Sequence, residues 1–307
     1  MASPKRPGAR PLTMEAARAE CGRDVQIVGV IGSPVAHSLS PLLHNTAFAA
    51  LGLADIWRSY AFEVAPGRAA SALEAMRTAD ISGLSVTMPH KADVADLVDE
   101  CSDVARRLDA VNCVQQEEGR LLGTNTDGAG FVASLARGAE FDPAGRRCLV
   151  IGAGGAARAV VLALADAGAT AIAVVNRTPE RAFEAAELAG KKGTAVPLTE
   201  GAIAQATGEA DLVVNATPVG MSGAAGAREG GLAEWLVAPE LMGPGQVAAD
   251  LVYVPRPTPW LEEAAAAGAT TLDGLGMLVH QAAAQLLLWT GVAPPVEAMW
   301  RAVIANS

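Results

Sequence analysis

Short apolar runs alternate with amphipathic stretches along most of the chain. In the first third, strand-like runs cover residues 25–31, 56–64 and 81–88, and helical patterns begin near Ser40 and Gly67. Apolar runs of this length, separated by helical patterns, are typical of parallel strands joined by helices. The alternation therefore predicts an α/β fold with mostly parallel sheets.

The pattern changes between residues 111 and 125. Two short runs flank Glu118 and Gly119 there, and we expect a β-hairpin. After this segment the alternation becomes regular and predicts repeated strand–helix units. Strands are predicted at 147–152, 171–178, 211–218 and 245–255, and helices at 156–168, 276–291 and 294–306.

Charge and cysteine usage exclude several classes of partner and site. The 307 residues carry a formal net charge of −10, which argues against nucleic acid and anionic membrane surfaces as partners. The four cysteines are scattered and form no Cys-x-x-Cys pair, so we expect reduced thiols in a cytoplasmic protein and no metal site. Residues 1–25 lack the apolar run of a secretory signal and are expected to form a flexible tail or a short extra helix.

A glycine-rich turn follows the predicted strand at 147–152. Gly152, Gly154 and Ala157 stand at the positions of a dinucleotide-binding turn that opens a helix. Such a helix start offers free N–H groups to phosphates. The cofactor is expected to contact Gly152, Ala153, Gly154, Gly155 and Ala156. The alternative is a tight turn with only a structural role.

The end of the next predicted strand selects the dinucleotide. An NAD site usually places an acidic residue there, for the ribose 2′-hydroxyl. This strand ends instead with Asn176, Arg177 and Thr178, and Arg181 follows one helical turn later. Donors and positive charge suit a 2′-phosphate, so the sequence favours NADP. The alternative, which can hold at the same time, is a solvated arginine beside a threonine N-cap.

Two ionisable residues follow strand-like runs outside the nucleotide-binding segment. Lys91 ends the segment GLSVTMPHK, and Asp127 lies within GTNTDGAG. Taken singly, such a lysine is most often a surface charge, and an aspartate before glycine is most often a turn or cap residue. Neither residue identifies a reaction alone.

Together with other segments, these residues resemble the shikimate dehydrogenase family over nearly all of residues 26–307. The matching segments, in chain order, are GSPVAHSLSPLLHN, VTMPHK, AVN, NTDGAG, GAGGAARA, NRT, NATPVGM, DLVYVPRPTPWL and GLGMLVHQAA. The resemblance implies a substrate domain, formed by 26–126 with 279–307, and an NADP-binding Rossmann domain at 127–278. The active site is then expected in the cleft between them.

The same resemblance implies an activity. It is the reversible, NADPH-dependent reduction of 3-dehydroshikimate to shikimate in aromatic amino-acid synthesis, by a monomer or a homodimer. Lys91 is implied to exchange a proton with the reacting oxygen or stabilise its charge, and Asp127 to bind adjacent hydroxyls and orient Lys91. Ser38 and Ser40 are implied to bind the substrate carboxylate. Their alternative role is helix capping at Ser40, and we expect His44 to be structural.

Further contacts come from the same family match. The implied substrate-binding residues are Thr87, Asn112, Gln281 and, more weakly, Tyr253. Residues expected near the nicotinamide are Met221, Leu251 and Gly274. The chain departs from the family pattern at Ser85, where asparagine is usual, and this puts the substrate geometry there in doubt.

Other functions stay open at this point. One is a quinate/shikimate dehydrogenase that uses NAD, although the NRT segment argues against it. Another is a relative that acts on an amino analogue of the substrate. A third is a catalytically silent dinucleotide sensor, for which the presence of both Lys91 and Asp127 is unfavourable.

Overall fold

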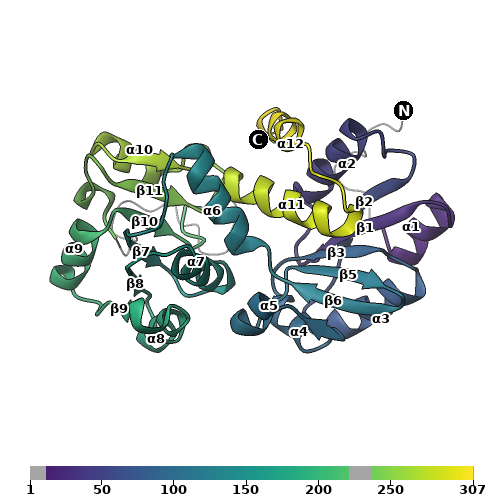
Figure 1. The fold of residues 1–307 in the computed structure, drawn as a ribbon, viewed down its shortest axis with the longest axis horizontal. Helices are drawn as coiled ribbons and strands as arrows, with labels where there is room; N and C mark the ends of the chain where they lie inside the picture. Colours follow the sequence, from purple (N-terminus) through teal and green to yellow (C-terminus); the bar gives the residue numbers. More distant parts are fainter. Residues whose placement is uncertain (1–11, 221–236, 307) are drawn as a thin grey trace. The chain divides into compact units, whose positions relative to one another are not determined.

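The computed structural model describes residues 12–220 and 237–306, which fall into two compact units (Figure 1). The first unit takes the described chain up to Asn125 together with Gln285–Ile304. The second takes Thr126–Ala284 and the residues from Ala305 onward. The family pattern predicts these boundaries at residues 126/127 and 278/279. At the second boundary the packing instead assigns the part of the last long helix before Gln285 to the second unit.

The sheet of the first unit is mixed. Its strands, in spatial order, are β2 (Trp57–Glu63), β1 (Gln26–Gly32), β3 (Gly83–Val86), β5 (Cys113–Glu117), β6 (Arg120–Thr124) and β4 (Glu100–Cys101). The first three strands are parallel, and β5 and β6 form the expected antiparallel hairpin. Glu118 and Gly119 both have positive φ angles at its turn, which fits the strand twist.

Helices cover both faces of this sheet. They are α1 (Met14–Cys21), α2 (Ser40–Ala50), α3 (Ala69–Thr78), α4 (Lys91–Ala95), α5 (Asp103–Leu108) and α12 (Val296–Ile304), with the end of α11 (Leu275–Thr290). Apolar residues of α1, α3, α4 and α5 share one buried cluster with β1, β2 and β3. Trp289 of α11 packs closely on Gly83 of β3, where no other residue type would leave room for the indole.

The sheet of the second unit is parallel throughout, as the alternation of strands and helices predicts. In spatial order its strands are β12 (Thr270–Leu272), β11 (Val247–Asp250), β10 (Leu212–Asn215), β7 (Arg147–Ile151), β8 (Ala171–Val175) and β9 (Gly193–Ala195). Every residue of β10 and β11 is buried, the pattern of a sheet covered on both faces. This order and direction are those of a Rossmann sheet.

Two hydrophobic clusters lie on the two faces of the second sheet. One joins α6 (Asp127–Gly138), α7 (Gly155–Asp166) and α8 (Pro179–Glu187) to the sheet. The other joins α9 (Glu200–Glu209) and α10 (Pro259–Ala266) to the opposite face. The sheet therefore carries a helical layer on each face (Figure 1).

The amino-terminal segment is ordered over residues 14–21. These residues form α1, the short extra helix of the two expectations, with Met14 and Ala17 buried. Residues 1–11, to which the expectation of a flexible tail also applies, lie outside the described residues. Arg18 anchors the helix by donating to the carbonyls of Ala79 and Val25 at 2.8 and 2.7 Å. The two buried apolar side chains and these hydrogen bonds hold the segment in place. Its polar composition gave no indication of this packing.

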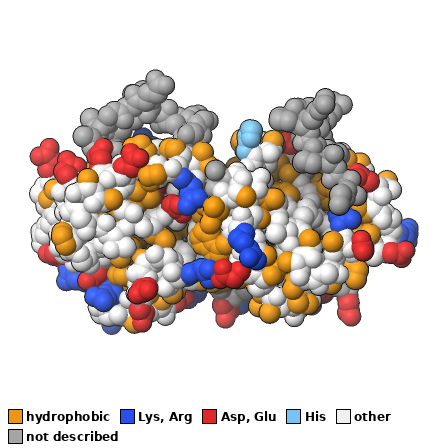
Figure 2. Space-filling view, turned by 90° about the horizontal axis from the view of Figure 1, so that it is seen from above, with side chains coloured by type: hydrophobic (Ala, Val, Ile, Leu, Met, Phe, Trp, Pro, Cys, Tyr) orange, Lys and Arg blue, Asp and Glu red, His pale blue; other side chains and the backbone are white. Residues whose placement is uncertain are grey.

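The described surface shows charges of both signs. On the face in Figure 2, acidic and basic side chains are dispersed rather than gathered in a large basic patch. No helix within the described ranges is long and apolar enough to cross a membrane.

Candidate active site

The serine-rich loop after β1 is built differently from a capped helix start. Leu39 is the N-cap of α2, and Ser40 is its first residue, followed by Pro41. The Ser40 side chain therefore does not cap the helix; the Ser38 hydroxyl accepts from the Ser40 N–H at 3.3 Å. Ser40 is 5% exposed, and no hydrogen bond joins its hydroxyl to another described residue. A buried hydroxyl in this state suits a ligand atom.

The next turn of α2 is hydrogen-bonded to the edge strand β2. His44 is fully buried, and its Nδ1 lies 3.0 Å from the Ser59 hydroxyl. The side chain of Asn45 donates to the Ser59 carbonyl and accepts from its N–H, both at 2.9 Å. Burial lowers the pKa of His44 to about 3, so the ring is neutral. These contacts support the structural role expected for His44.

The residues after β3 bring several predicted groups together. Thr87 follows the strand, and the half-buried Lys91 opens α4. The Lys91 carbonyl accepts from the Val111 N–H at 2.8 Å, which fixes the start of α4 beside Asn112. Asn112 is 1% exposed, and its carbonyl accepts from the N–H of Val86 at 2.7 Å. The main chains that carry Lys91 and Asn112 are thus neighbours in the first unit.

His90, which precedes the lysine, adds a second anchor that the sequence did not suggest. It is fully buried, and its Nε2 donates to the Val64 carbonyl at 2.7 Å. A carbonyl can only accept, so this geometry assigns the proton to Nε2. The start of α4 is therefore tied to the end of β2.

Ser85 lies in β3, two residues before Thr87, which is the first residue after the strand. It is 5% exposed and pairs in register with Val30 and Cys113. No hydrogen bond joins its hydroxyl to another described residue. The position where the family pattern has asparagine is thus buried and polar, beside a predicted substrate contact.

The main chains around Asp127 and Gln281 approach each other within the second unit. Asp127 opens α6 and is 5% exposed. Thr126, the residue before it, donates from its hydroxyl to the Gln281 carbonyl at 3.2 Å. One turn later α6 crosses α11 so closely that a Cβ on Gly130 would stand 2.7 Å from the Gln281 nitrogen. A glycine at this crossing lets the main chains that carry Asp127 and Gln281 approach each other closely.

The glycine-rich turn has the form of a phosphate cradle. Gly152 has a φ angle of +108°, and a Cβ there would lie 3.1 Å from the Ala216 carbonyl oxygen, so the fold itself requires glycine. A Cβ on Gly154 or Gly155 would meet nothing within 4 Å. Their lack of side chains leaves open space in front of α7, whose N-cap Gly154 supplies no side-chain cap. Phosphate oxygens fit that space and the helix N–H groups.

The polar groups at the end of β8 stand in the pattern that the sequence predicts. Arg177, Thr178 and Arg181 are exposed. Thr178 is the N-cap of α8, but its side chain makes no capping hydrogen bond, which weakens the purely structural alternative. The Asn176 side chain donates to the Thr178 carbonyl at 3.0 Å and shapes this turn. Two guanidinium groups and a hydroxyl suit a ribose phosphate.

The residues expected beside a nicotinamide follow β11 and β12. Leu251 and Tyr253 come directly after β11, and burial raises the pKa of the Tyr253 phenol. Gly274 precedes α11 and packs on the Leu251 carbonyl. Met221 lies outside the described residues. Near these positions lies a buried cluster of Asn215, Asp250 and Thr258 that the sequence analysis did not identify. Polar residues at the ends of two buried strands are the signal that could have revealed it.

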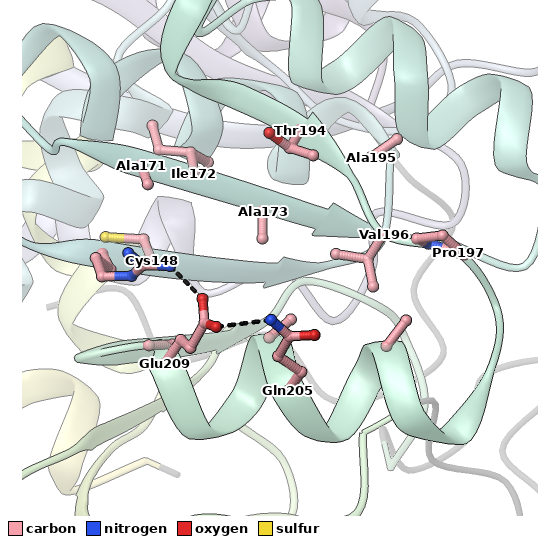
Figure 3. Close-up of a pocket in the computed structure, with 14 residues that line it drawn as sticks. Cys148, Ala171, Ile172, Ala173, Thr194, Ala195, Val196, Pro197, Gln205 and Glu209 are labelled. Carbon is pink, nitrogen blue, oxygen red and sulfur yellow. Dashed lines mark hydrogen bonds and ion pairs between the residues drawn. The ribbon is translucent and has the colours of Figure 1, made fainter.

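The predicted residues divide between the two units. Ser38, Ser40, Thr87, Lys91 and Asn112 belong to the first, and Asp127, Gln281, Tyr253 and all the described cofactor residues belong to the second. A cavity of about 280 Å³ in the second unit shares no residue with either set. It lies between α9 and β8, where Gln205 donates to Glu209 at 2.9 Å (Figure 3). We assign the cavity no part in the candidate site.

Family models cover most of the chain. Residues 30–114 match the shikimate dehydrogenase substrate binding domain. Residues 134–220 match the shikimate / quinate 5-dehydrogenase model, and residues 274–304 match the shikimate 5′-dehydrogenase C-terminal domain. The matched regions include Ser38, Lys91 and the glycine-rich turn.

Relatives that align over nearly their whole length agree with these matches. The chain is 44% identical over 287 residues to the shikimate dehydrogenase (NADP(+)) of Methanopyrus kandleri, covering 92% of this chain and 96% of that protein. Shikimate 5-dehydrogenase from Thermus thermophilus, solved with NADP(H) and shikimate, superposes with a TM-score of 0.81 at 38% identity, covering 92% of this chain and 100% of that one. Quinate dehydrogenase from Corynebacterium glutamicum, solved with NAD, gives 0.82 at 30% identity, with 92% and 100% covered. The chain belongs to the shikimate dehydrogenase family.

Proposed function

We propose that this chain catalyses the reversible, NADP-dependent reduction of 3-dehydroshikimate to shikimate. The observation that carries the proposal is the placement of Lys91. It opens α4 four residues after Thr87, and its carbonyl accepts a hydrogen bond from the N–H of Val111, the residue before Asn112. The segments that carry an ammonium group, an alcohol and a carboxamide are thus neighbours, and these are the groups needed to hold a polyhydroxylated ring and act on one of its oxygens.

The loop after β1 binds the substrate carboxylate. Hydroxyl groups can hold an anion as hydrogen-bond donors without a buried cation. Ser40 is fixed in this position because His44 and Asn45, on the same helix, are bonded to Ser59. Ser38 is oriented through its bond to the Ser40 N–H. Little side-chain or loop ordering is then required when the carboxylate binds.

Lys91 holds the proton that the reduction consumes. In the reducing direction its ammonium donates to the oxygen that gains negative charge, and in the oxidising direction the amine accepts that proton. Its positive charge also lowers the energy of the developing alkoxide. The anchors at Val111 and Val64 hold the start of α4, so the lysine side chain samples a restricted region.

Asp127 and Gln281 bind the remaining hydroxyls of the ring. A carboxylate accepts from hydroxyl groups, and a carboxamide can both donate and accept. The close crossing of α6 and α11 at Gly130 supports this assignment, because it holds the main chains that carry the two residues near each other. A site built on several such bonds rejects substrates that lack a matching hydroxyl.

The turn at Gly152–Ala156 would hold the cofactor's pyrophosphate, and Arg177, Thr178 and Arg181 would hold its 2′-phosphate. When bound, NADPH supplies the hydride. The open space at Gly154 and Gly155 and the uncapped start of α7 support this assignment. The positive charge at the end of β8 favours NADP over NAD, because no carboxylate stands there to accept from a free ribose hydroxyl.

The test is an initial-rate assay of cofactor absorbance that crosses shikimate and quinate with NADP and NAD. Turnover largely confined to shikimate with NADP is expected. Efficient quinate oxidation or a preference for NAD would move the chain to the quinate dehydrogenase activity that one structural relative carries in its name. Binding of NADP without turnover of either acid would favour the sensor function instead.

The proposed reaction takes place in the cytoplasm and involves small molecules only. All four cysteines are free thiols, and Cys113 and Cys148 are buried, which fits a reducing compartment. Burial raises the pKa of Cys148 to about 12, so this thiol is unreactive.

A further inference from the structure

Three chain segments of the second unit converge on the carboxylate of Asp250, which ends β11. Asn215, at the end of the neighbouring strand β10, donates its side-chain N–H to Oδ1 at 3.0 Å. The main-chain N–H of Val252 donates to the same oxygen at 3.0 Å. Thr258, the N-cap of α10, donates its hydroxyl to Oδ2 at 2.7 Å. Asp250 is 1% exposed, so these bonds are shielded from water.

Each side-chain donor is itself held by a second contact. The Asn215 Oδ1 accepts from the N–H and the hydroxyl of Thr217, at 3.1 and 2.7 Å. The Thr258 hydroxyl accepts from the Leu261 N–H at 3.4 Å, which caps α10. The carboxylate therefore joins the segment after β10, the segment after β11 and the start of a helix into one network.

The network encloses the main chain of Leu251. The Leu251 N–H donates to the Asn215 carbonyl at 2.9 Å. On the other side of Leu251, the Val252 N–H donates to the Asp250 carboxylate, and the Val252 carbonyl accepts from the Gly274 N–H at 3.3 Å. Gly274 in turn packs against the Leu251 carbonyl. The peptide groups around Leu251 are fixed from several directions.

The surroundings of Asp250 oppose its ionisation. Burial raises the pKa of Asp250 to about 6, and the nearby Asp273 carboxylate adds to that rise, while the three donors lower it. Asp273 is itself paired with Arg256 at 2.6 Å. A carboxylate whose ionisation is opposed by burial costs stability at neutral pH. What the carboxylate contributes is the set of three hydrogen bonds by which its oxygens join the segments around Leu251.

We infer that Asp250 is a positioning residue for the cofactor, and that its hydrogen bonds set the main chain at Leu251 against which the nicotinamide ring is placed. The inference rests on the proposed function, since it takes Leu251 and Gly274 as neighbours of that ring. Asp250 itself touches neither cofactor nor substrate. It acts through the peptide groups it holds.

The test compares two replacements of Asp250. The Asp250→Asn variant keeps an oxygen that can accept from Asn215 and Val252 and gains an N–H that can donate to Thr258. The Asp250→Ala variant loses all three bonds. We expect Asp250→Ala to raise the dissociation constant of NADPH by about tenfold or more, because three buried hydrogen bonds are lost. We expect Asp250→Asn to stay within about threefold, because the bonds can re-form.

A matched control lies at the other end of the same strand. Gln246 precedes β11 and makes three hydrogen bonds, to the Gly243 N–H at 2.8 Å and to the carbonyls of Thr207 and Ala210 at 2.8 and 2.7 Å. Gln246→Ala therefore removes a comparable number of bonds away from Leu251. It should lower the melting temperature as Asp250→Ala does, while NADPH affinity stays at the wild-type level.

Three readouts separate positioning from general stability. NADPH binding is measured by the fluorescence of the bound cofactor, shikimate binding by calorimetry without cofactor, and hydride transfer by the deuterium isotope effect with 4-deuterated NADPH. Asp250→Ala should weaken NADPH binding and change the isotope effect, with shikimate affinity unchanged. Unchanged NADPH affinity in Asp250→Ala, an equal loss in Gln246→Ala, or an equal loss in Asp250→Asn would each overturn the inference. Wild-type protein that binds NADPH without oxidising shikimate would overturn the proposed function instead, and the binding comparison would still report on Asp250.

Discussion

A Cβ placed on Gly274 would stand 2.1 Å from the main-chain oxygen of Leu251. That distance is far inside van der Waals contact, so any side chain at 274 must push the two segments apart. Both residues are among those that the family resemblance implies to lie near the nicotinamide ring. Their close approach is therefore a structural requirement that bears directly on cofactor geometry.

We expect Gly274→Ala to weaken NADPH binding and to reduce kcat/KM for shikimate by about tenfold or more, since small displacements of positioning groups are costly. Kinetics and cofactor titration check this. Gly208→Ala is the control, because a Cβ there meets nothing within 4 Å and the residue lies in α9. It should retain full activity and gain up to about 1 kcal/mol of stability. Full activity in Gly274→Ala would contradict the expected geometry.

The glycine-rich turn allows its structural and ligand-binding roles to be separated. A Cβ on Gly154 meets only open space, whereas Gly152 has a positive φ angle and lies against Ala216. We expect Gly154→Ala to leave the melting temperature unchanged while raising the dissociation constant of NADPH about tenfold or more, because the added methyl group occupies the phosphate space. Gly152→Ala should instead lower the melting temperature, since alanine is strained at that φ. Equal NADPH affinity in wild type and Gly154→Ala would favour a turn with a structural role only.

Much of the fold is encoded in patterns that can be followed along the sequence. The strands of both sheets follow from runs such as 25–31 and 147–152, because buried parallel strands are continuously apolar. The hairpin at Glu118 and Gly119 was likewise predictable from its turn residues. β4 and α4 were not, because segments of two and five residues are too short to show a period.

The candidate site was less predictable from the sequence than the fold. Lys91 and Asp127 could be assigned a catalytic role only through the family resemblance, because single ionisable residues after strands are common. The proximity of Asp127 to Gln281 could not be inferred, since it depends on a helix crossing at Gly130. The capping role considered for Ser40 proved wrong for a related reason: helix boundaries shift by a residue, and Leu39 became the N-cap.

The acid stability of the first unit should depend on His44. Burial disfavours the imidazolium and lowers the pKa of His44 from its ordinary value of 6.5 to about 3 in the folded chain. Below pH 6.5 the unfolded chain binds a proton that the folded chain does not, so stability falls as the pH drops from about 6.5 towards 3. The loss amounts to a few kcal/mol, given about 1.4 kcal/mol for each pH unit between the two pKa values.

Two variants test this dependence by chemical unfolding between pH 7 and pH 4. His44→Asn removes the titrating group and should flatten the dependence, although the smaller side chain lowers stability at pH 7. Ser59→Ala removes only the 3.0 Å contact to His44 and should keep the slope. Asp250 has the opposite effect on stability. Its pKa is about 6 in the folded chain, so the folded chain binds a proton that the unfolded chain does not, and stability rises as the pH falls from about 6 to 3.8. A slope that persists in His44→Asn would assign the acid sensitivity to another group.

Lys91 should be required for turnover but not for cofactor binding. We expect Lys91→Ala to lower kcat by about two to four orders of magnitude, the range of general acid–base catalysis. The dissociation constant of NADPH should change little, because the phosphate-binding groups all lie in the second unit. Stopped-flow measurement of the hydride step and cofactor titration check both parts. A collapse of NADPH binding, or activity near the wild-type level, would contradict the proposed proton-transfer role.

Ser85 provides the sharpest test of how the substrate site is shaped. The side chain is buried in β3, two residues before Thr87, yet no hydrogen bond holds its hydroxyl to another described residue. Because the family pattern has asparagine here, we expect the backbone to accept Ser85→Asn with a melting temperature within a few degrees of wild type. The longer amide should then reach a ring hydroxyl that serine reaches only through water.

We therefore expect Ser85→Asn to lower KM for shikimate by a few fold, about the value of one hydrogen bond at 0.5–1.5 kcal/mol, with KM for NADP unchanged. Ser85→Ala is the matched control: it removes the hydroxyl without adding volume and should raise KM for shikimate. If Ser85→Asn instead lost several degrees of melting temperature, the space beside Ser85 would be filled by packed side chains, and overpacking would explain the cost. Serine at this position would then be required by the fold, and substrate recognition would depend on Thr87 and Asn112 instead.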